Sequence, residues 1–190
     1  DKNEMHDNIV NISVDYAMTH GLDGLVLDFE PMLDCYASDY AAVVKQIRQG
    51  IGSKQLFLCG SINREDLSNA SIKLFEQDVD AFISMDYDTE CKTISSYKSK
   101  ITSEITRIGK LLKNSKMNYI PLGPGQYTNR PNDYHDPNVE NAVTHSQALM
   151  DALTDSDVKI FGSGVWHWDG TVKLKNGQER IDFMTYWVEQ

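Results

Sequence analysis

The sequence has few of the features that mark several large classes of protein. No apolar run approaches the ~20 residues that a membrane-spanning helix needs. The three cysteines, Cys35, Cys59 and Cys91, form no CxxC pair and are too few for a closed disulfide framework. Basic residues number 18 against 28 acidic ones, and the net charge of −10 repels phosphate groups. We therefore expect neither a nucleic-acid nor a membrane partner.

The motifs that bind nucleotides and metal ions are missing as well. No GxGxxG or GxxxxGKS/T segment follows any predicted strand, so the glycine loops that cradle phosphate groups are absent. His135 and His145 show no HExxH or other ligand spacing. We expect no cofactor and no metal ion.

The composition that is present is ordinary for a globular domain. Of the 190 residues, 41% are hydrophobic and 24% are charged, and a chain of this length buries roughly 70% of its unfolded surface. We find no linker, so residues 1–190 are predicted to form a single segment.

Periodicity predicts an alternation of helices and strands. Helical spacing of apolar residues indicates helices at 6–20, 39–50, 71–76, 95–112, 139–153 and 180–188. Short apolar runs indicate strands at 24–30, 55–61, 81–87, 118–122 and 159–168. Gly21 and Gly50 are expected to end the first two helices, and Asp39 to cap the start of the second. Such alternation is typical of an α/β fold with a parallel sheet, either doubly wound or closed into a (β/α)8 barrel.

Polar side chains gather where the predicted strands end. These residues are Asp28, Glu30, Ser61, Asn63, Tyr87, Asp88, Trp168 and Asp169. In a barrel, the carboxyl ends of the strands form the face that holds the active site. We therefore place the candidate site at this face.

The segment 23–30, DGLVLDFE, carries the clearest chemical signal. Strand side chains alternate, so Val26, Asp28 and Glu30 are predicted to share one face, opposite Leu25, Leu27 and Phe29. Two carboxylates at one strand end are suited to general acid–base catalysis. The alternative is a pair of solvated charges where the strand meets a loop.

The same segment resembles the DGxDxDxE signature of family 18 glycoside hydrolases, the chitinases and endo-β-N-acetylglucosaminidases. In that family the motif lies on the fourth strand of a TIM barrel. The resemblance assigns Glu30 as general acid and Asp28 as its neighbouring carboxylate, with Asp23 and Gly24 opening the motif. Val26 departs from the pattern, because the family usually has aspartate there.

Later segments resemble the family in the same order. Residues 85–88, MDYD, match its MxYD motif, in which Tyr87 would contact the substrate acetamido group and Asp88 the sugar hydroxyls. Residues 164–168, GVWHW, resemble its GxMxW strand ending, and Trp168 would lie under the reacting sugar. Residues 118–125 are a looser match to its seventh strand. Met85 and Tyr127 are further candidate substrate contacts.

The resemblance implies a retaining, substrate-assisted glycosidase that acts on β-linked N-acetylglucosamine and is secreted. It needs no cofactor, and its partner is a glycan. The five predicted strands correspond to strands four to eight of the TIM barrel, so the first three βα units are not found. We expect them on another chain, on an excised part of the gene product or on a second copy.

Two other functions are compatible with the sequence. The first is a catalytically weak or inactive glycan-binding module, which the departure at Val26 favours. The second is a metal-dependent barrel enzyme in which Asp28, Glu30, Asp86 and Asp88 gather Mg²⁺. For Asp86 alone, we expect a charge that is solvated or that lies behind the site.

Overall fold

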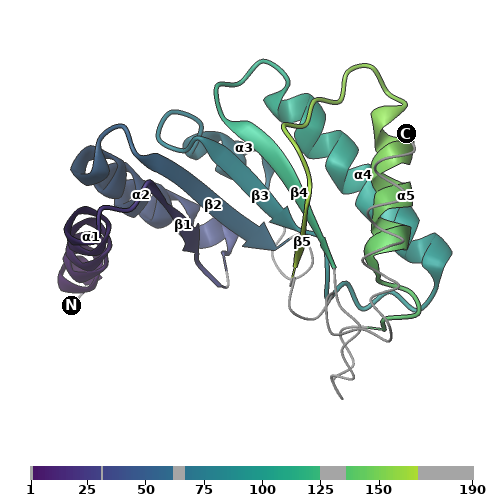
Figure 1. Cartoon of the computed structure of the whole chain (residues 1–190), viewed down its shortest axis with the longest axis horizontal. Helices are drawn as coiled ribbons and strands as arrows, with labels where there is room; N and C mark the ends of the chain where they lie inside the picture. Colours follow the sequence, from purple (N-terminus) through teal and green to yellow (C-terminus); the bar gives the residue numbers. More distant parts are fainter. Residues whose placement is uncertain (1, 31, 62–66, 125–135, 167–190) are drawn as a thin grey trace. The chain divides into compact units, whose positions relative to one another are not determined.

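The computed structural model describes residues 2–30, 32–61, 67–124 and 136–166. The chain forms two compact units, one of Asp1–Ile83 with Asn114–Asn118 and one of Ser84–Lys113 with Tyr119–Gln190. Helices and strands alternate along the described chain (Figure 1). The strands are ordered β1-β2-β3-β4-β5, so neighbours in the sheet are also neighbours in the chain. A doubly wound sheet reverses its strand order at a switch point, whereas a barrel does not. The order therefore favours part of a barrel-type α/β fold.

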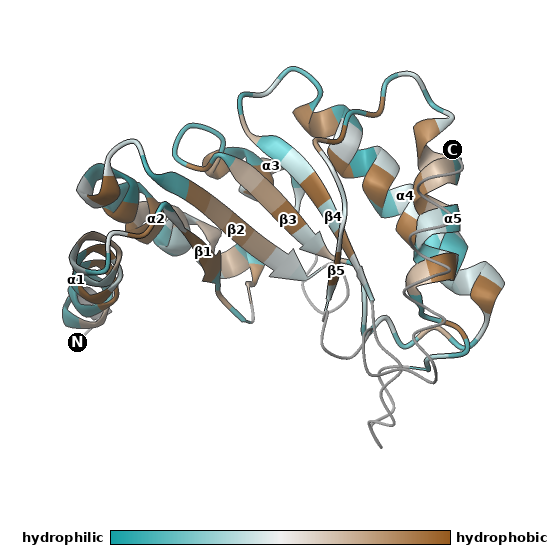
Figure 2. Ribbon diagram, in the orientation of Figure 1, coloured by the Kyte–Doolittle hydropathy of each residue, from teal (hydrophilic) through white to brown (hydrophobic). Residues whose placement is uncertain are grey.

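The first unit packs helices against the start of the sheet. It contains α1 Lys2–Thr19, β1 Gly24–Asp28, η1 Asp34–Tyr36, α2 Ala37–Ile51, β2 Gln55–Ser61 and α3 Asn69–Leu74, and β3 Ala81–Met85 begins in it. Strands β1 and β2 are parallel, with Leu27 beside Leu58. Hydrophobic residues dominate these two strands (Figure 2). The buried core includes Ala17, Val43, Val44, Ile47, Leu56, Leu58, Ile72 and Phe75.

The second unit contains the end of β3 and the elements α4 Ile94–Leu112, β4 Asn118–Pro124, α5 Ala142–Leu153 and β5 Gly164–Trp166. Strands β4 and β5 are parallel. Capping boxes start both helices, at Thr93 for α4 and at Asn141 for α5, so their first backbone N–H groups are bonded. The apolar face of α4 is buried at Ile101, Ile105, Ile108 and Leu112. These residues form part of the core of the unit, with Tyr97, Tyr119, Ala148 and Leu149.

The ends of the helices confirm one prediction and correct two. Gly21 ends α1 as expected: with φ at 62°, it donates to Met18, and Leu22 donates to Ala17. Asp39 was expected to cap α2, but the helix begins at Ala37 after the turn η1, so Asp39 lies in its first turn. Gly50 was expected to end this helix, but Gly52 does, with φ at 63°.

The other element boundaries differ from prediction by a few residues. Strand β2 has the predicted bounds. Strand β3 ends at Met85, two residues earlier than predicted, and α5 begins at Ala142, three residues later than predicted. Strand β5 is limited to Gly164–Trp166 within the described part of the chain. The helix predicted at 180–188 lies outside the described residues.

Arg48 stabilises the first unit where β2 and β3 begin, at the opposite end of the strands from the candidate site. Its Nε donates to the carbonyl of Asp78 at 2.7 Å, and Nη2 pairs with Asp80 Oδ2 at 2.6 Å. The same carboxylate oxygen accepts the N–H of Leu56 at 2.8 Å. Because these contacts lie where β2 and β3 begin, they serve stability and leave the carboxyl ends of the strands to the site.

Candidate active site

The two carboxylates of the first unit lie at the carboxyl end of β1, as predicted. Asp28 and Glu30 are exposed, and Val26 on the same face is 57% exposed, whereas Leu27 is buried. Phe29 stacks on Tyr40 of α2 with ring centroids 5.2 Å apart. This contact holds Phe29 against α2. Asp28 is the last residue of β1, Glu30 lies two residues beyond it, and both side chains are exposed.

Cys59 of β2 neighbours Asp28 across the pair of strands. It lies beside Asp28 in the register of β1 and β2, and its side chain is buried. Burial, and then the negative charges of Asp28 and Glu30, raise the pKa of the Cys59 thiol to about 12. The sequence analysis considered Cys59 only for CxxC and disulfide pairing, although alignment of the predicted strands 24–30 and 55–61 would have placed it beside Asp28.

The loop after Glu30 is tied to the start of α3. Asp34 Oδ1 accepts the N–H of Ser68 at 2.8 Å, and Met32 is fully buried. Hydrogen bonding from the Ser71 hydroxyl, and then from the Ser68 backbone, lowers the pKa of Asp34 below its ordinary value. The chain on the carboxyl side of Glu30 is thus held at two points.

The second predicted group follows β3 in the second unit. Met85 is 3% exposed, while Tyr87 and Asp88 are half-buried. Asp88 adopts the left-handed backbone conformation, with φ at 55°, as does Glu90, with φ at 59°. Aspartate tolerates this region better than most residues because its short side chain bonds locally, but both residues still carry conformational strain.

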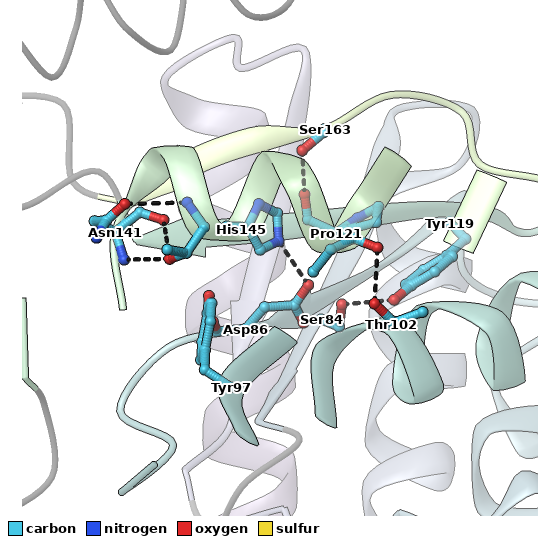
Figure 3. Close-up of polar contacts among 11 residues, drawn as sticks. Ser84, Asp86, Tyr97, Thr102, Tyr119, Pro121, Asn141, His145 and Ser163 are labelled. Carbon is cyan, nitrogen blue, oxygen red and sulfur yellow. Dashed lines mark hydrogen bonds and ion pairs between the residues drawn. The ribbon is translucent and has the colours of Figure 1, made fainter. Parts of the chain in front are cut away.

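The structure excludes one of the two alternatives predicted for Asp86, a solvated charge or a charge that lies behind the site. Asp86 is fully buried, and its Oδ2 lies 3.0 Å from His145 Nε2 of α5 (Figure 3). The Tyr97 hydroxyl donates to the Asp86 carbonyl at 2.8 Å. Burial raises the pKa of Asp86 above its ordinary value, and the His145 hydrogen bond opposes that shift. The solvated interpretation is wrong because helices α4 and α5 supply partners that allow the carboxyl group inside.

His145 was missed as a partner of the site. Sequence analysis considered it only as a metal ligand and found no suitable spacing. It lies on the buried face of α5 with Ala148, Leu149 and Ala152, and a polar residue on such a face needs a polar partner. That pattern could have predicted a buried hydrogen bond. Gly123 makes room for the ring, since a Cβ there would lie 2.3 Å from His145 Cγ.

The predicted site residues fall into two groups that belong to different units. Asp28 and Glu30 lie in the first, and Met85, Tyr87 and Asp88 lie in the second. The convergence of the two groups at one mouth stays a prediction. Asn63, Tyr127, Trp168 and Asp169 lie outside the described residues.

The magnesium hypothesis loses one of its four carboxylates. The described ranges contain no group of three His, Cys, Asp or Glu side chains placed to hold a metal ion. Asp86 is enclosed and bonded to His145, so it does not face a site at the end of β3.

Among the helices in the described parts of the chain, none is long and apolar enough to cross a membrane.

Comparison with known proteins identifies the fold. No family model matches the chain, and no curated protein matches it. It is similar to the crystal structure of a protein from Bacteroides thetaiotaomicron that is assigned provisionally as an alpha-L-fucosidase, with a TM-score of 0.63 and 12% identity. The match covers 94% of this chain and 60% of the neighbour, so the chain spans less than two thirds of that protein's length. The likeness shows a fold shared with that protein, in agreement with the predicted barrel-type α/β class.

Proposed function

We propose that this chain carries the catalytic carboxylates of a glycosidase, with Glu30 as general acid and base. The observation that carries the proposal is the exposed pair Asp28, the last residue of β1, and Glu30, two residues beyond it. In a barrel-type fold this is the face where substrates bind. The fold likeness to a protein assigned provisionally as a fucosidase supports the reaction class. The resemblance of DGLVLDFE to family 18 supports the substrate, a glycan with β-linked N-acetylglucosamine.

The proposed reaction retains configuration and uses the substrate as its own nucleophile, an exception to the two-carboxylate scheme of most glycosidases. Glu30 protonates the glycosidic oxygen while the 2-acetamido oxygen of the sugar attacks the anomeric carbon, and the glycosidic bond breaks. Asp28 lies against the positively charged oxazolinium ion that results, and Tyr87 donates to the acetamido oxygen. Glu30 then takes a proton from water. The water oxygen bonds to the anomeric carbon, the bond from that carbon to the acetamido oxygen breaks, and the oxazolinium ring opens. Asp88, Met85, Tyr127 and Trp168 are the proposed sugar contacts.

We propose that further βα units complete the fold beside β1, on another segment or a second chain. Strand β1 stands at one end of the strand order, and none of the other described strands pairs with its second edge. On α1, Met5, Ile12 and Tyr16 are 55%, 70% and 56% exposed. Their i, i+7, i+11 spacing places them on one stripe of the helix. A strand and an amphipathic helix would cover this edge and this stripe together.

One observation favours a glycan-binding module as the second candidate. Val26 lies on the face of Asp28 and is 57% exposed, so the position where the family has an aspartate carries no charge here. Loss of that charge beside Asp28 weakens catalysis more than binding, because binding depends on the sugar contacts.

The deciding experiment replaces Glu30 with glutamine in the full-length protein. Glu30→Gln keeps the size of the side chain but removes the transferable proton, so turnover of an N-acetylglucosamine oligomer should fall about 10²- to 10⁴-fold. Oligomer affinity, measured by calorimetry, should stay the same. Glu4→Gln, at an exposed glutamate in the first turn of α1, is the matched control and should retain turnover.

Two outcomes would contradict the proposal. Wild-type turnover that Glu30→Gln keeps would remove Glu30 from the acid role. Tight oligomer binding without turnover in either protein would favour the binding module.

A further inference from the structure

The segment after β3 has a backbone that needs outside support. Asp88 and Glu90 both adopt positive φ values, 55° and 59°, in a stretch without helix or strand. Such conformations persist only where the flanking structure holds the chain firmly on both sides. Tyr87 and Asp88, the residues proposed to contact sugar, lie in this stretch.

The first support is Asp86. Its N–H donates to the carbonyl of Leu122 at 2.9 Å, and its own carbonyl accepts the Tyr97 hydroxyl at 2.8 Å. Its carboxylate is held by His145 at 3.0 Å. Three elements, β4, α4 and α5, therefore fix the residue that precedes Tyr87. Figure 3 shows the contact with His145 of α5.

The second support is Thr89, which follows Asp88. Its N–H donates to Glu140 Oε1 at 2.9 Å, and its hydroxyl donates to the same oxygen. Thr89 is 5% exposed and Glu140 is fully buried, so water does not compete for these charge-assisted bonds. Glu140 is itself fixed, because its N–H donates to the carbonyl of Asp136 at 2.7 Å just before α5 begins.

We propose that Glu140 and His145 are positioning residues, which together clamp the Tyr87–Asp88 segment from the start of α5. His145 holds the residue before the segment and Glu140 holds the residue after it, so the two side chains set the conformation in which Tyr87 and Asp88 meet a ligand. The inference rests on the proposed function for the identity of that ligand, a glycan containing N-acetylglucosamine. The clamp itself is a property of the unliganded chain.

The test compares four variants of the full-length protein. Glu140→Gln and Thr89→Val weaken the second support with little change of volume, and Thr89→Ser restores the hydroxyl. Thr102→Val is the matched control, because it makes the same side-chain change as Thr89→Val at a hydroxyl that donates to the Ala148 carbonyl at 3.1 Å and takes no part in the hydrogen bonds of Asp86 or Thr89 described above. Two quantities are measured: amide hydrogen exchange at residues 87–90 without ligand, and affinity for an oligomer of three β-linked N-acetylglucosamine units.

The clamp predicts faster exchange at residues 87–90 in Glu140→Gln and Thr89→Val than in Thr102→Val, with the rates compared at the same unfolding free energy. Oligomer affinity should fall about ten-fold in the same two variants, the scale of one lost charge-assisted bond. Thr89→Ser should restore the wild-type exchange rate and the wild-type affinity. If Glu140→Gln does not fold, the comparison of Thr89→Val with Thr89→Ser still tests the clamp.

Three results would overturn the clamp or its positioning role, or would separate the clamp from the proposed function. Exchange that matches the Thr102→Val control would overturn the clamp, whatever the ligand. Faster exchange with unchanged affinity would overturn the positioning role. A wild type that does not bind the oligomer would overturn the proposed function, while the exchange comparison would still decide for or against the clamp.

Discussion

Burial governs the chemistry of single side chains in this protein more than net charge does. Cys59 and Asp86 are both enclosed, and burial is the largest cause of the raised pKa of each. A raised pKa keeps the neutral form, which is inert for a thiol. Cys59 beside Asp28 is therefore a packing residue and a marker of the carboxylates, with no nucleophilic role.

Alkylation distinguishes Cys59 from an accessible thiol. With a pKa of about 12, only about one Cys59 in 10⁴ is a thiolate at pH 8, and its side chain is buried. We expect iodoacetamide to label the exposed Cys35 in the folded protein and to leave Cys59 unmodified, as judged by peptide mass spectrometry. Labelling of all three cysteines in guanidinium is the control. Equal labelling of Cys59 and Cys35 without denaturant would contradict the assignment.

At the level of elements, close approach of helices explains a glycine that the sequence pattern misassigned. Gly50 lies inside α2, and a Cβ there would lie 2.4 Å from Val14 Cγ2 on α1. Val14 is β-branched and has one preferred rotamer in a helix, so it yields poorly. The glycine is needed for contact between α1 and α2, while Gly52 ends the helix.

A double-mutant cycle tests this contact. Alanine normally stabilises a helix by up to about 1 kcal/mol over glycine, but overpacking costs about 1–3 kcal/mol. We expect Gly50→Ala to lower the free energy of unfolding by about 1 kcal/mol, measured by urea denaturation. In a Val14→Ala background the same change should stabilise the protein. Additive effects of the two changes would show that the helices do not meet at this point.

Local patterns predicted the elements better than the contacts between them. Strand β2 is bounded by polar residues and has its predicted limits, and the apolar run before Asp28 correctly placed that residue at the end of β1. The pairing of Asp86 with His145 spans 59 residues, which periodicity does not encode. The start of α2 was misplaced because the turn η1 supplies a helical entry without a side-chain cap.

For the molecule as a whole, the buried carboxyl group of Asp86 couples stability to pH. The groups that act on it are His145 of α5, Glu104 and Tyr97 of α4, Tyr119 of β4 and Ser84 of β3. Because the pKa of Asp86 is raised in the folded state, folding favours its protonated form. Stability is therefore lost as pH rises from the ordinary aspartate value of 3.8 through the raised value.

Replacement of Asp86 by asparagine should flatten this dependence. Over that window the wild type should lose up to about 1.4 kcal/mol of unfolding free energy per pH unit from this group. In Asp86→Asn, urea denaturation at a series of pH values should show a shallower decline, because asparagine does not titrate. An identical decline in both proteins would assign the pH dependence to other groups.

The strand order has a consequence for how the chain folds. Since each strand pairs with the strand that precedes it in the sequence, every sheet contact closes over one helical crossover only. The entropy lost on closing a loop grows with its length, so short closures limit the barrier to folding. During synthesis, each βα unit emerges next to a strand that is already made, and the sheet can grow in the direction of translation. Interruption of the chain within a crossover would therefore halt growth at that point and leave the earlier strands paired.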